Sequence, residues 1–241
     1  MSELPKALTV QEVLDIYNNP SHKLTILDVR KGYKFLKFHI KNAIFALLHF
    51  EEVKLENIDR TWTDENYPKL TSYLIPKNSS IVLIAEPEDL AYAYKLLIEY
   101  KFTGILGYMD GSIEDWRALG GPTDGINGVN VDEVLDMDFS EGSGNVLMDV
   151  RTKDEWDEDG VNGVAKLLDL MNVPFIQSLD ESKLYFVYCC EGSRSLMVAS
   201  YLVTLGYNVS NVIGGCDEMI SKGGKMVTYK DSQLMKYNDD N

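Results

Sequence analysis

LTILDVR, residues 24–30, returns later in the chain as NVLMDVR, residues 145–151. Both are short apolar runs that end in Asp-Val-Arg, a pattern typical of a buried strand whose polar end emerges into a loop. Each run follows a segment with helical patterning, residues 9–17 (TVQEVLDIY) and residues 130–137 (NVDEVLDM). At the start of the first, Thr9 and Glu12 have the spacing of a capping box. The pattern predicts a repeated helix-strand unit.

A second pair of matching segments extends the repeat. Residues 80–85 (SIVLIA) and 184–189 (LYFVYC) are rich in β-forming residues, and each leads through a short loop into an amphipathic helix. A further strand, a glycine-containing turn and a closing helix follow in both halves. The predicted helices after the loops cover residues 90–100 and 193–205, and the predicted strands after them cover 104–107 and 209–213.

Alternating strands and helices imply a mainly parallel sheet with helices on its faces. We therefore predict an α/β protein of two domains, residues 1–121 and 122–241. The stretch 120–125 (GGPTDG) has the composition of a linker. A chain of 241 residues is long enough for two packed cores of this size.

The chain is acidic, and the acidity is concentrated in its second half. The net charge is −15; residues 1–121 carry 14 Lys and Arg against 17 Asp and Glu, and residues 122–241 carry 9 against 21. Such a field repels phosphate backbones, so we expect neither nucleic acid nor an anionic membrane as a partner. The N-terminus lacks the pattern of a signal peptide, and the few cysteines suit a reducing compartment. A cytoplasmic location is the expectation.

The halves differ at the end of the matching strands. Cys189 stands where the first half has Ala85, and all three cysteines, Cys189, Cys190 and Cys216, lie in the second half. The first half also has an extra stretch, roughly residues 51–69. These differences predict that the chemistry belongs to the second half.

Cys189 occupies a position that favours a reactive thiolate. Loop N–H groups and the positive end of the next helix can form an anion-binding nest around its sulfur. Gly192 permits a backbone angle that a side chain would forbid, and Arg194 adds a planar cation. Ser193 or Ser195 can cap the helix or donate to the sulfur. The alternative is activation by a histidine, but His22, His39 and His49 all lie in the first half, so we favour activation by the loop.

These residues resemble the rhodanese family of sulfurtransferases. The matching motif is Cys189-x-x-Gly192-x-Arg194-Ser195, flanked by Asp149-Val150-Arg151, Glu155-Trp156 and the Gly214-Gly215 turn. The first half is similar through residues 28–30 (DVR), 39–43 (HIKNA) and 110–116 (DGSIEDW). The resemblance covers nearly the whole chain, as a tandem pair whose first domain lacks the catalytic cysteine.

The resemblance implies sulfur transfer in two steps. Cys189, the catalytic residue, takes the outer sulfur of thiosulfate or a thiol persulfide, and a thiol, sulfite or cyanide then accepts it. The donor is expected to contact the loop at Cys190, Glu191, Gly192, Ser193, Arg194 and Ser195. No cofactor is implied, and no metal site is expected because no Cys, His and carboxylate cluster has ligand spacing. By analogy with rhodanese domains that are fused to persulfide dioxygenases, a separate persulfide dioxygenase is an expected partner.

Several positions depart from the family pattern. Residues 157–164 (DEDGVNGV) lack the usual Gly-His-Ile-x-Gly-Ala run, Phe38 replaces a glycine in the first half, and Met219 stands where the first half has Trp116. Glu191 is expected to offset Arg194 and weaken the field for a dianion. We therefore favour a persulfide donor over thiosulfate.

The remaining polar residues have structural and functional interpretations. For Cys190, a passive loop position is favoured over a resolving thiol; for Cys216, a buried inert thiol over a redox partner. Asp149 with Arg151, and Arg151 with Glu155, are interpreted as ion pairs that brace the loop. Two other functions stay open: a cysteine-dependent phosphatase or arsenate reductase, disfavoured by a loop one residue shorter than that class uses, and a non-catalytic interaction protein.

Overall fold

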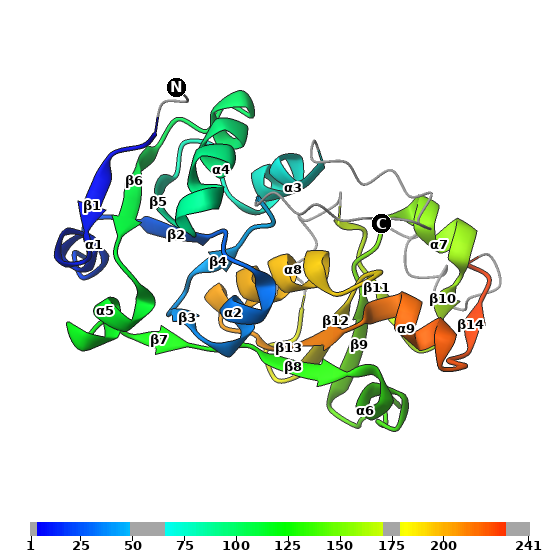
Figure 1. The fold of residues 1–241 in the computed structure, drawn as a ribbon. Helices are drawn as coiled ribbons and strands as arrows, with labels where there is room; N and C mark the ends of the chain where they lie inside the picture. The colour runs from blue at the N-terminus through cyan, green and yellow to red at the C-terminus, as the bar shows by residue number, and fades with distance from the viewer. Residues whose placement is uncertain (1–3, 49–65, 171–178, 230–241) are drawn as a thin grey trace. The chain divides into compact units, whose positions relative to one another are not determined.

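The computed structural model of the chain describes residues 4–48, 66–170 and 179–229. It divides into two compact units, Met1–Gly125 and Ile126–Asn241 (Figure 1). The domain border expected after residue 121 lies slightly before this division. The reason is a short antiparallel pairing in the first unit, in which β7 (Thr123–Asp124) joins β3 (His39–Ile40).

The first unit is built on a parallel sheet whose described strands follow the order β1-β6-β5-β2-β4. These strands are β1 (Ala7–Thr9), β2 (Leu24–Asp28), β4 (Ile44–Phe45), β5 (Ser80–Ile84) and β6 (Ile105–Asp110). The helices of this unit are α1 (Val10–Tyr17), α2 (Gly32–Lys37), α3 (Asn66–Leu74), α4 (Pro87–Glu99) and α5 (Ile113–Ala118).

The second unit repeats this sheet with the order β8-β13-β12-β9-β11, in which each strand takes the place of its equivalent in the first unit. Its strands are β8 (Asn127–Asn130), β9 (Asn145–Asp149), β11 (Lys166–Leu167), β12 (Leu184–Tyr188) and β13 (Asn208–Ile213), with β10 (Val161–Asn162) and β14 (Met226–Val227) paired outside the sheet. The helices are α6 (Val131–Leu135), α7 (Lys153–Asp159), α8 (Ser193–Thr204) and α9 (Gly215–Ser221). The predicted α/β class, with two parallel sheets flanked by helices, is confirmed.

The predicted elements differ from the observed ones mainly at their ends. The strand expected over residues 104–107 is observed as β6 and continues to Asp110, because β5 pairs with it as far as Tyr108 and β1 pairs with it from Tyr108 to Asp110. The capping box at Thr9 is present: the Glu12 carboxylate accepts the Thr9 N–H at 2.7 Å, and the Thr9 hydroxyl accepts the Glu12 N–H at 3.2 Å. The extra stretch at residues 51–69 lies largely outside the described residues.

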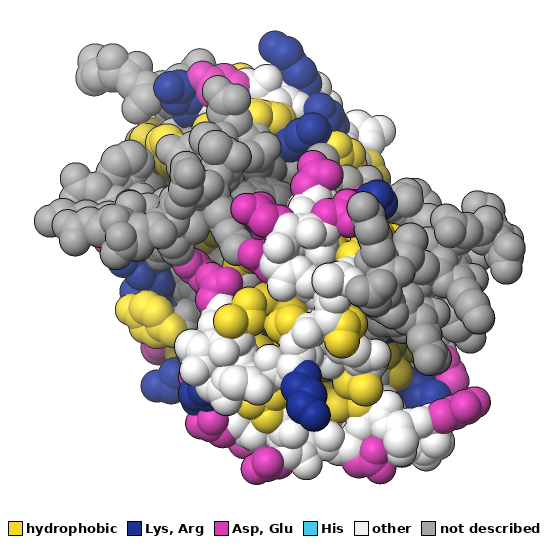
Figure 2. Space-filling view, turned by 90° about the vertical axis from the view of Figure 1, so that its right-hand side faces the viewer, with side chains coloured by type: hydrophobic (Ala, Val, Ile, Leu, Met, Phe, Trp, Pro, Cys, Tyr) yellow, Lys and Arg dark blue, Asp and Glu magenta, His cyan; other side chains and the backbone are white. Residues whose placement is uncertain are grey.

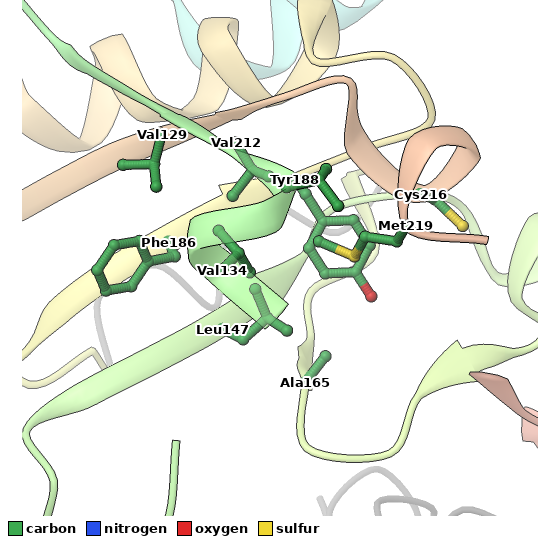
Figure 3. Packing of buried hydrophobic residues seen from close by; sticks show 10 residues of the cluster. Val129, Val134, Leu147, Ala165, Phe186, Tyr188, Val212, Cys216 and Met219 are labelled. Carbon is green, nitrogen blue, oxygen red and sulfur yellow. The ribbon is translucent and has the colours of Figure 1, made fainter. Parts of the chain in front are cut away.

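One core cluster of the second unit is formed mainly by residues of β8, β9, β12 and β13 and of the helices α6 and α9. Its buried members include Val129, Val134, Leu147, Phe186 and Val212, and Tyr188, Met219 and Cys216 come together at one end (Figure 3). Burial of this many apolar side chains is the main source of stability, at about 1.5–3 kcal/mol for each large one. None of the helices in the described parts of the chain is long and apolar enough to cross a membrane.

Candidate active site

Cys189 follows the last residue of β12, the middle strand of the second sheet. β9 and β13 pair with β12 on either side, and α8 begins at Ser193, so residues 189–192 link the end of the strand to a helix N-terminus. Cys189 is buried, with 1% of its surface exposed. A thiol placed here lies in the field of the aligned peptide dipoles of a helix of 12 residues.

The sulfur of Cys189 already accepts a hydrogen bond from the loop. The Gly192 N–H donates to Cys189 Sγ across 3.2 Å, as expected of a nest that stabilises a thiolate. Gly192 has φ +107°, the left-handed region that favours glycine. No side chain caps α8, so the proposed capping role of Ser193 or Ser195 is wrong for this helix.

The carbonyl of Gly192 is held by two side chains. Ser195 Oγ donates to it at 3.0 Å and Asn211 Nδ2 at 3.1 Å. Because the C=O and N–H of a trans peptide point in opposite directions, these bonds also fix the direction of the Ser193 N–H. Asn211, a buried polar residue within β13, is a contributor that the sequence analysis missed; its signal was an amide in the interior of a predicted strand.

Glu155 of α7 binds Arg194 through two parallel hydrogen bonds. Arg194 Nη1 donates to Glu155 Oε2 and Nη2 to Glu155 Oε1, both at 2.7 Å. Burial alone raises the pKa of Glu155, but the hydrogen bonds and charge of Arg194 outweigh it and the pKa falls to about 2. The Thr152 N–H and hydroxyl also donate to Glu155 Oε2, each at 2.9 Å.

This pairing corrects two expectations. Glu155 was expected to pair with Arg151, and Glu191 to offset Arg194. In the structure Glu191 is exposed, and the carboxylate that meets Arg194 comes from a different element, α7. The helix places Glu155 over the loop while Arg151 turns back toward Asp149.

Cys190 joins the same buried cluster. Its thiol donates to Glu155 Oε1 at 2.9 Å, and its sulfur accepts from Arg194 Nη2 at 3.0 Å. Burial raises the pKa of Cys190 far above the ordinary value, and the nearby Glu155 adds to the shift although Arg194 opposes it. Cys190 is therefore held as a neutral thiol, which makes it a poor nucleophile.

The start of α9 holds the backbone of both loop cysteines. The Cys216 N–H donates to the Cys189 carbonyl at 2.7 Å, and the Asp217 N–H donates to the Cys190 carbonyl at 3.1 Å. The Cys216 side chain points into the core, and burial raises its pKa to about 12. The backbone of Cys216, rather than its thiol, contacts the loop.

Gly215 allows this close approach, and we predict that Gly215→Ala destabilises the second unit. A Cβ there would lie 2.4 Å from the Cys189 carbonyl oxygen and 2.3 Å from that of Cys190, at φ +53°. We expect the free energy of unfolding to fall by about 3 kcal/mol, from the backbone strain and the overpacking together. Urea unfolding followed by circular dichroism measures the loss.

Gly223→Ala is the matched control for this prediction. Gly223 has φ +81°, but a Cβ there would meet nothing within 4 Å, so only the backbone term of about 1–2 kcal/mol applies. Equal losses in the two variants would contradict a role for close packing at Gly215.

Arg151 and Asp149 form a buried clasp below the loop. Arg151 Nε and Nη2 donate to the Asp149 carboxylate, with Nη2 at 2.8 Å, and Nη2 also donates to the Gly160 carbonyl at 2.7 Å. The Val150 N–H between them donates to the Tyr188 carbonyl at 3.0 Å. The clasp thus fixes the strand end from which Cys189 emerges.

The first unit keeps the clasp and lacks the thiol. Arg30 Nη2 donates to Asp28 at 2.7 Å and to the Phe38 carbonyl at 3.2 Å, as Arg151 does in the second unit. Ala85 follows β5, and the next residue, Glu86, accepts a hydrogen bond from Lys34 Nζ at 2.6 Å. The same scaffold therefore carries no nucleophile at this strand end.

His39 is packed inside the first unit. It is 1% exposed, its Nδ1 lies 2.7 Å from the Phe35 carbonyl, and its ring stacks on the Phe35 ring with centroids 3.8 Å apart. Burial lowers the pKa of His39. His49 lies outside the described residues. These contacts give His39 a structural role within its own unit.

The chain thus contains one α/β domain type twice, with equivalent parallel sheets, and only the second copy has a cysteine in the loop between its middle strand and the next helix. The sequence model of the rhodanese-like domain matches residues 9–119 and again residues 131–222. The chain belongs to the rhodanese-like domain family. No curated protein matches the chain.

Solved structures of single and longer chains are similar to parts or most of this one. A rhodanese-like domain protein from Staphylococcus aureus is 29% identical, with 42% of this chain and 94% of that chain covered and a TM-score of 0.36. The thiosulfate sulfurtransferase from Pseudomonas aeruginosa is 16% identical over 92% of this chain and 43% of its own, with a TM-score of 0.35. A Rhodopseudomonas palustris protein described as a possible tyrosine phosphatase is 19% identical over 49% and 96%, with a TM-score of 0.38.

Proposed function

We propose that the second unit is a sulfurtransferase that carries a sulfane sulfur on Cys189. The observation that carries the proposal is the hydrogen bond from the Gly192 N–H to Cys189 Sγ at the start of α8. This arrangement stabilises negative charge on that sulfur, both as the attacking thiolate and as the persulfide formed from it. Cys190 and Cys216, whose pKa values burial raises, are held as thiols.

The reaction proceeds through two successive nucleophilic displacements at the transferred sulfur. The Cys189 thiolate attacks the outer sulfur of a thiol persulfide or of thiosulfate; the S–S bond of the donor breaks, and a thiolate or sulfite leaves. A thiolate, sulfite or cyanide then attacks the outer sulfur of the Cys189 persulfide and regenerates the Cys189 thiolate. Loop amides, with Gly192 the one that contacts the sulfur at rest, supply the hydrogen bonds that hold the transferred sulfur.

The donor contacts expected at residues 190–195 can come from side chains or from backbone N–H groups, and the side chains of Cys190, Arg194 and Ser195 are already engaged within the protein. The Ser195 hydroxyl and Asn211 hold the Gly192 carbonyl, and Cys190 and Arg194 are hydrogen-bonded to Glu155. These side chains therefore shape the loop, and the backbone N–H groups of residues 191–194 are the groups we assign to the donor sulfur.

The phosphatase alternative demands a cation that faces a tetrahedral dianion. Arg194 is the loop's cation, and both of its terminal nitrogens bind Glu155. Acidic side chains are also spread over the face drawn in Figure 2, at its centre as well as along its lower rim. The pairing of Arg194 with Glu155 disfavours phosphate esters at the Cys189 site, and the net charge of −15 disfavours nucleic acid as a partner.

Intact-mass measurement tests the proposal. The purified chain is exposed briefly to glutathione persulfide or to thiosulfate, separated from excess donor and weighed, and the expected product has gained one sulfur. Added cyanide or sulfite should return the mass to its starting value and release thiocyanate or thiosulfate in equal amount. Steady release of phosphate from an aryl phosphate, with no sulfur uptake from either donor, would show that the chain is a phosphatase instead.

A further inference from the structure

The guanidinium of Arg194 is neutralised inside the protein before any donor arrives. Glu155 meets it with both carboxylate oxygens at 2.7 Å, and the two side chains are 9% and 5% exposed, respectively. A pair so well buried is shielded little by solvent and salt. The low pKa of Glu155 keeps the carboxylate charged throughout the physiological range.

We propose that Glu155 is a specificity-determining residue, which directs the Cys189 site toward donors whose reacting sulfur group carries no more than one negative charge and against donors in which that group is a dianion. The preferred class is then the thiol persulfides, and the disfavoured class contains thiosulfate and phosphate esters. The inference rests on the sulfurtransferase function proposed above and restricts the chemical class of its sulfur donor.

The charges around the loop support this assignment. The charges of Arg194 and Glu155 neutralise each other. The charge of Arg151 is neutralised by Asp149, and the Asp159 carboxylate lies 3.2 Å from Arg151 as well. Glu191 adds an exposed carboxylate in the loop itself. A dianion that enters such a site loses its hydration without gaining an ionic partner. The outer sulfur of a persulfide requires less, because backbone N–H groups of the kind that Gly192 directs at Cys189 Sγ suffice.

The first test compares donor selectivity in Glu155→Gln and the wild type. The amide keeps the shape and an acceptor oxygen but removes the negative charge beside Arg194. At an effective dielectric constant of about 20, removing one negative charge that lies within about 10 Å of the donor favours a dianion over a monoanion by about tenfold. We expect the ratio of the thiosulfate to the persulfide loading rate to rise by that factor.

Arg194→Met and Glu158→Gln complete the comparison. Arg194→Met leaves the carboxylate and should move the ratio the other way, toward the persulfide. Glu158→Gln removes the same charge from an exposed position on the same helix and should leave the ratio unchanged. A purely structural role for Glu155 would slow both donors equally, and an unchanged ratio in Glu155→Gln overturns the inference.

A measurement on the wild type covers the case in which the Glu155 variant does not fold. Sulfate, a dianion of similar size to thiosulfate, should not slow loading by glutathione persulfide at millimolar concentrations. Competitive inhibition by sulfate would overturn the inference without any variant. Failure of the wild type to load from either donor would instead overturn the sulfurtransferase function itself, so the two outcomes are distinct.

Discussion

Cys189→Ser is expected to abolish sulfur uptake from glutathione persulfide and from thiosulfate. A serine hydroxyl is not ionised by the loop field and cannot form a persulfide, so the loading rate should fall by at least about a thousandfold. The substitution keeps the size of the side chain and its place at the end of β12, where Gly192 donates to it. Intact mass and rapid-quench loading give the result, and unchanged circular dichroism shows that the fold is retained.

Cys190→Ser is the matched control. The Cys190 thiol donates to Glu155, and a serine hydroxyl can make the same bond, so the Glu155–Arg194 pair should stay in place. Loading should remain within about tenfold of the wild type, since Cys190 is held as a neutral thiol. If Cys190→Ser lost the added sulfur while Cys189→Ser kept it, the assignment of the nucleophile would be wrong.

Arg151→Met should unfold the second unit far more readily. Arg151 is fully buried, and removing it leaves the Asp149 carboxylate and the Gly160 carbonyl without its hydrogen bonds. Breaking one side of a buried pair costs about 3–5 kcal/mol. The free energy of unfolding from urea titration measures the loss, and sulfur loading should fall with it because the strand end beneath Cys189 is no longer held.

Two variants separate charge from packing in this prediction. Asp149→Leu combined with Arg151→Met removes both charges, and its loss should be clearly smaller than that of Arg151→Met alone. Arg30→Met removes the equivalent arginine from the first unit, where the clasp with Asp28 is the same. It should destabilise that unit while leaving the chemistry of Cys189 intact. A double variant as unstable as the single one would contradict the account.

The two buried arginines of the second unit thus serve different purposes. Arg151 belongs to the scaffold, since its equivalent in the first unit, Arg30, likewise binds the aspartate at the strand end and a backbone carbonyl where no thiol is present. Arg194 belongs to the cysteine loop, which the second unit has and the first unit lacks. Its partner Glu155 is the residue that we assign to donor selectivity. A change at Arg151 is therefore expected to act first on stability, and a change at Glu155 on the choice of donor.

The fold could be predicted from the sequence because its signals are local and repeated. Two apolar runs ending in Asp-Val-Arg predict two buried strands, and β2 and β9 occupy equivalent places in sheets of the same order. The comparison of Ala85 with Cys189 needs only that both follow the matching strand, as they do after β5 and β12. Periodicity and strand-end position are properties of neighbouring residues, so no tertiary information is required.

The partners of the charged residues could not be predicted in the same way. Glu155 lies four positions after Arg151, which made that pair the natural expectation, yet it binds Arg194, 39 residues further along the chain. Glu191, adjacent to the cysteines in sequence, faces solvent instead. Which carboxylate reaches which guanidinium depends on how α7 packs over the loop, and that is set by the whole core. Local sequence patterns are enough to predict the two α/β units and the strand end that carries Cys189. The surroundings of that sulfur depend on tertiary packing, because burial, and not proximity in sequence, selects the partner of a charge.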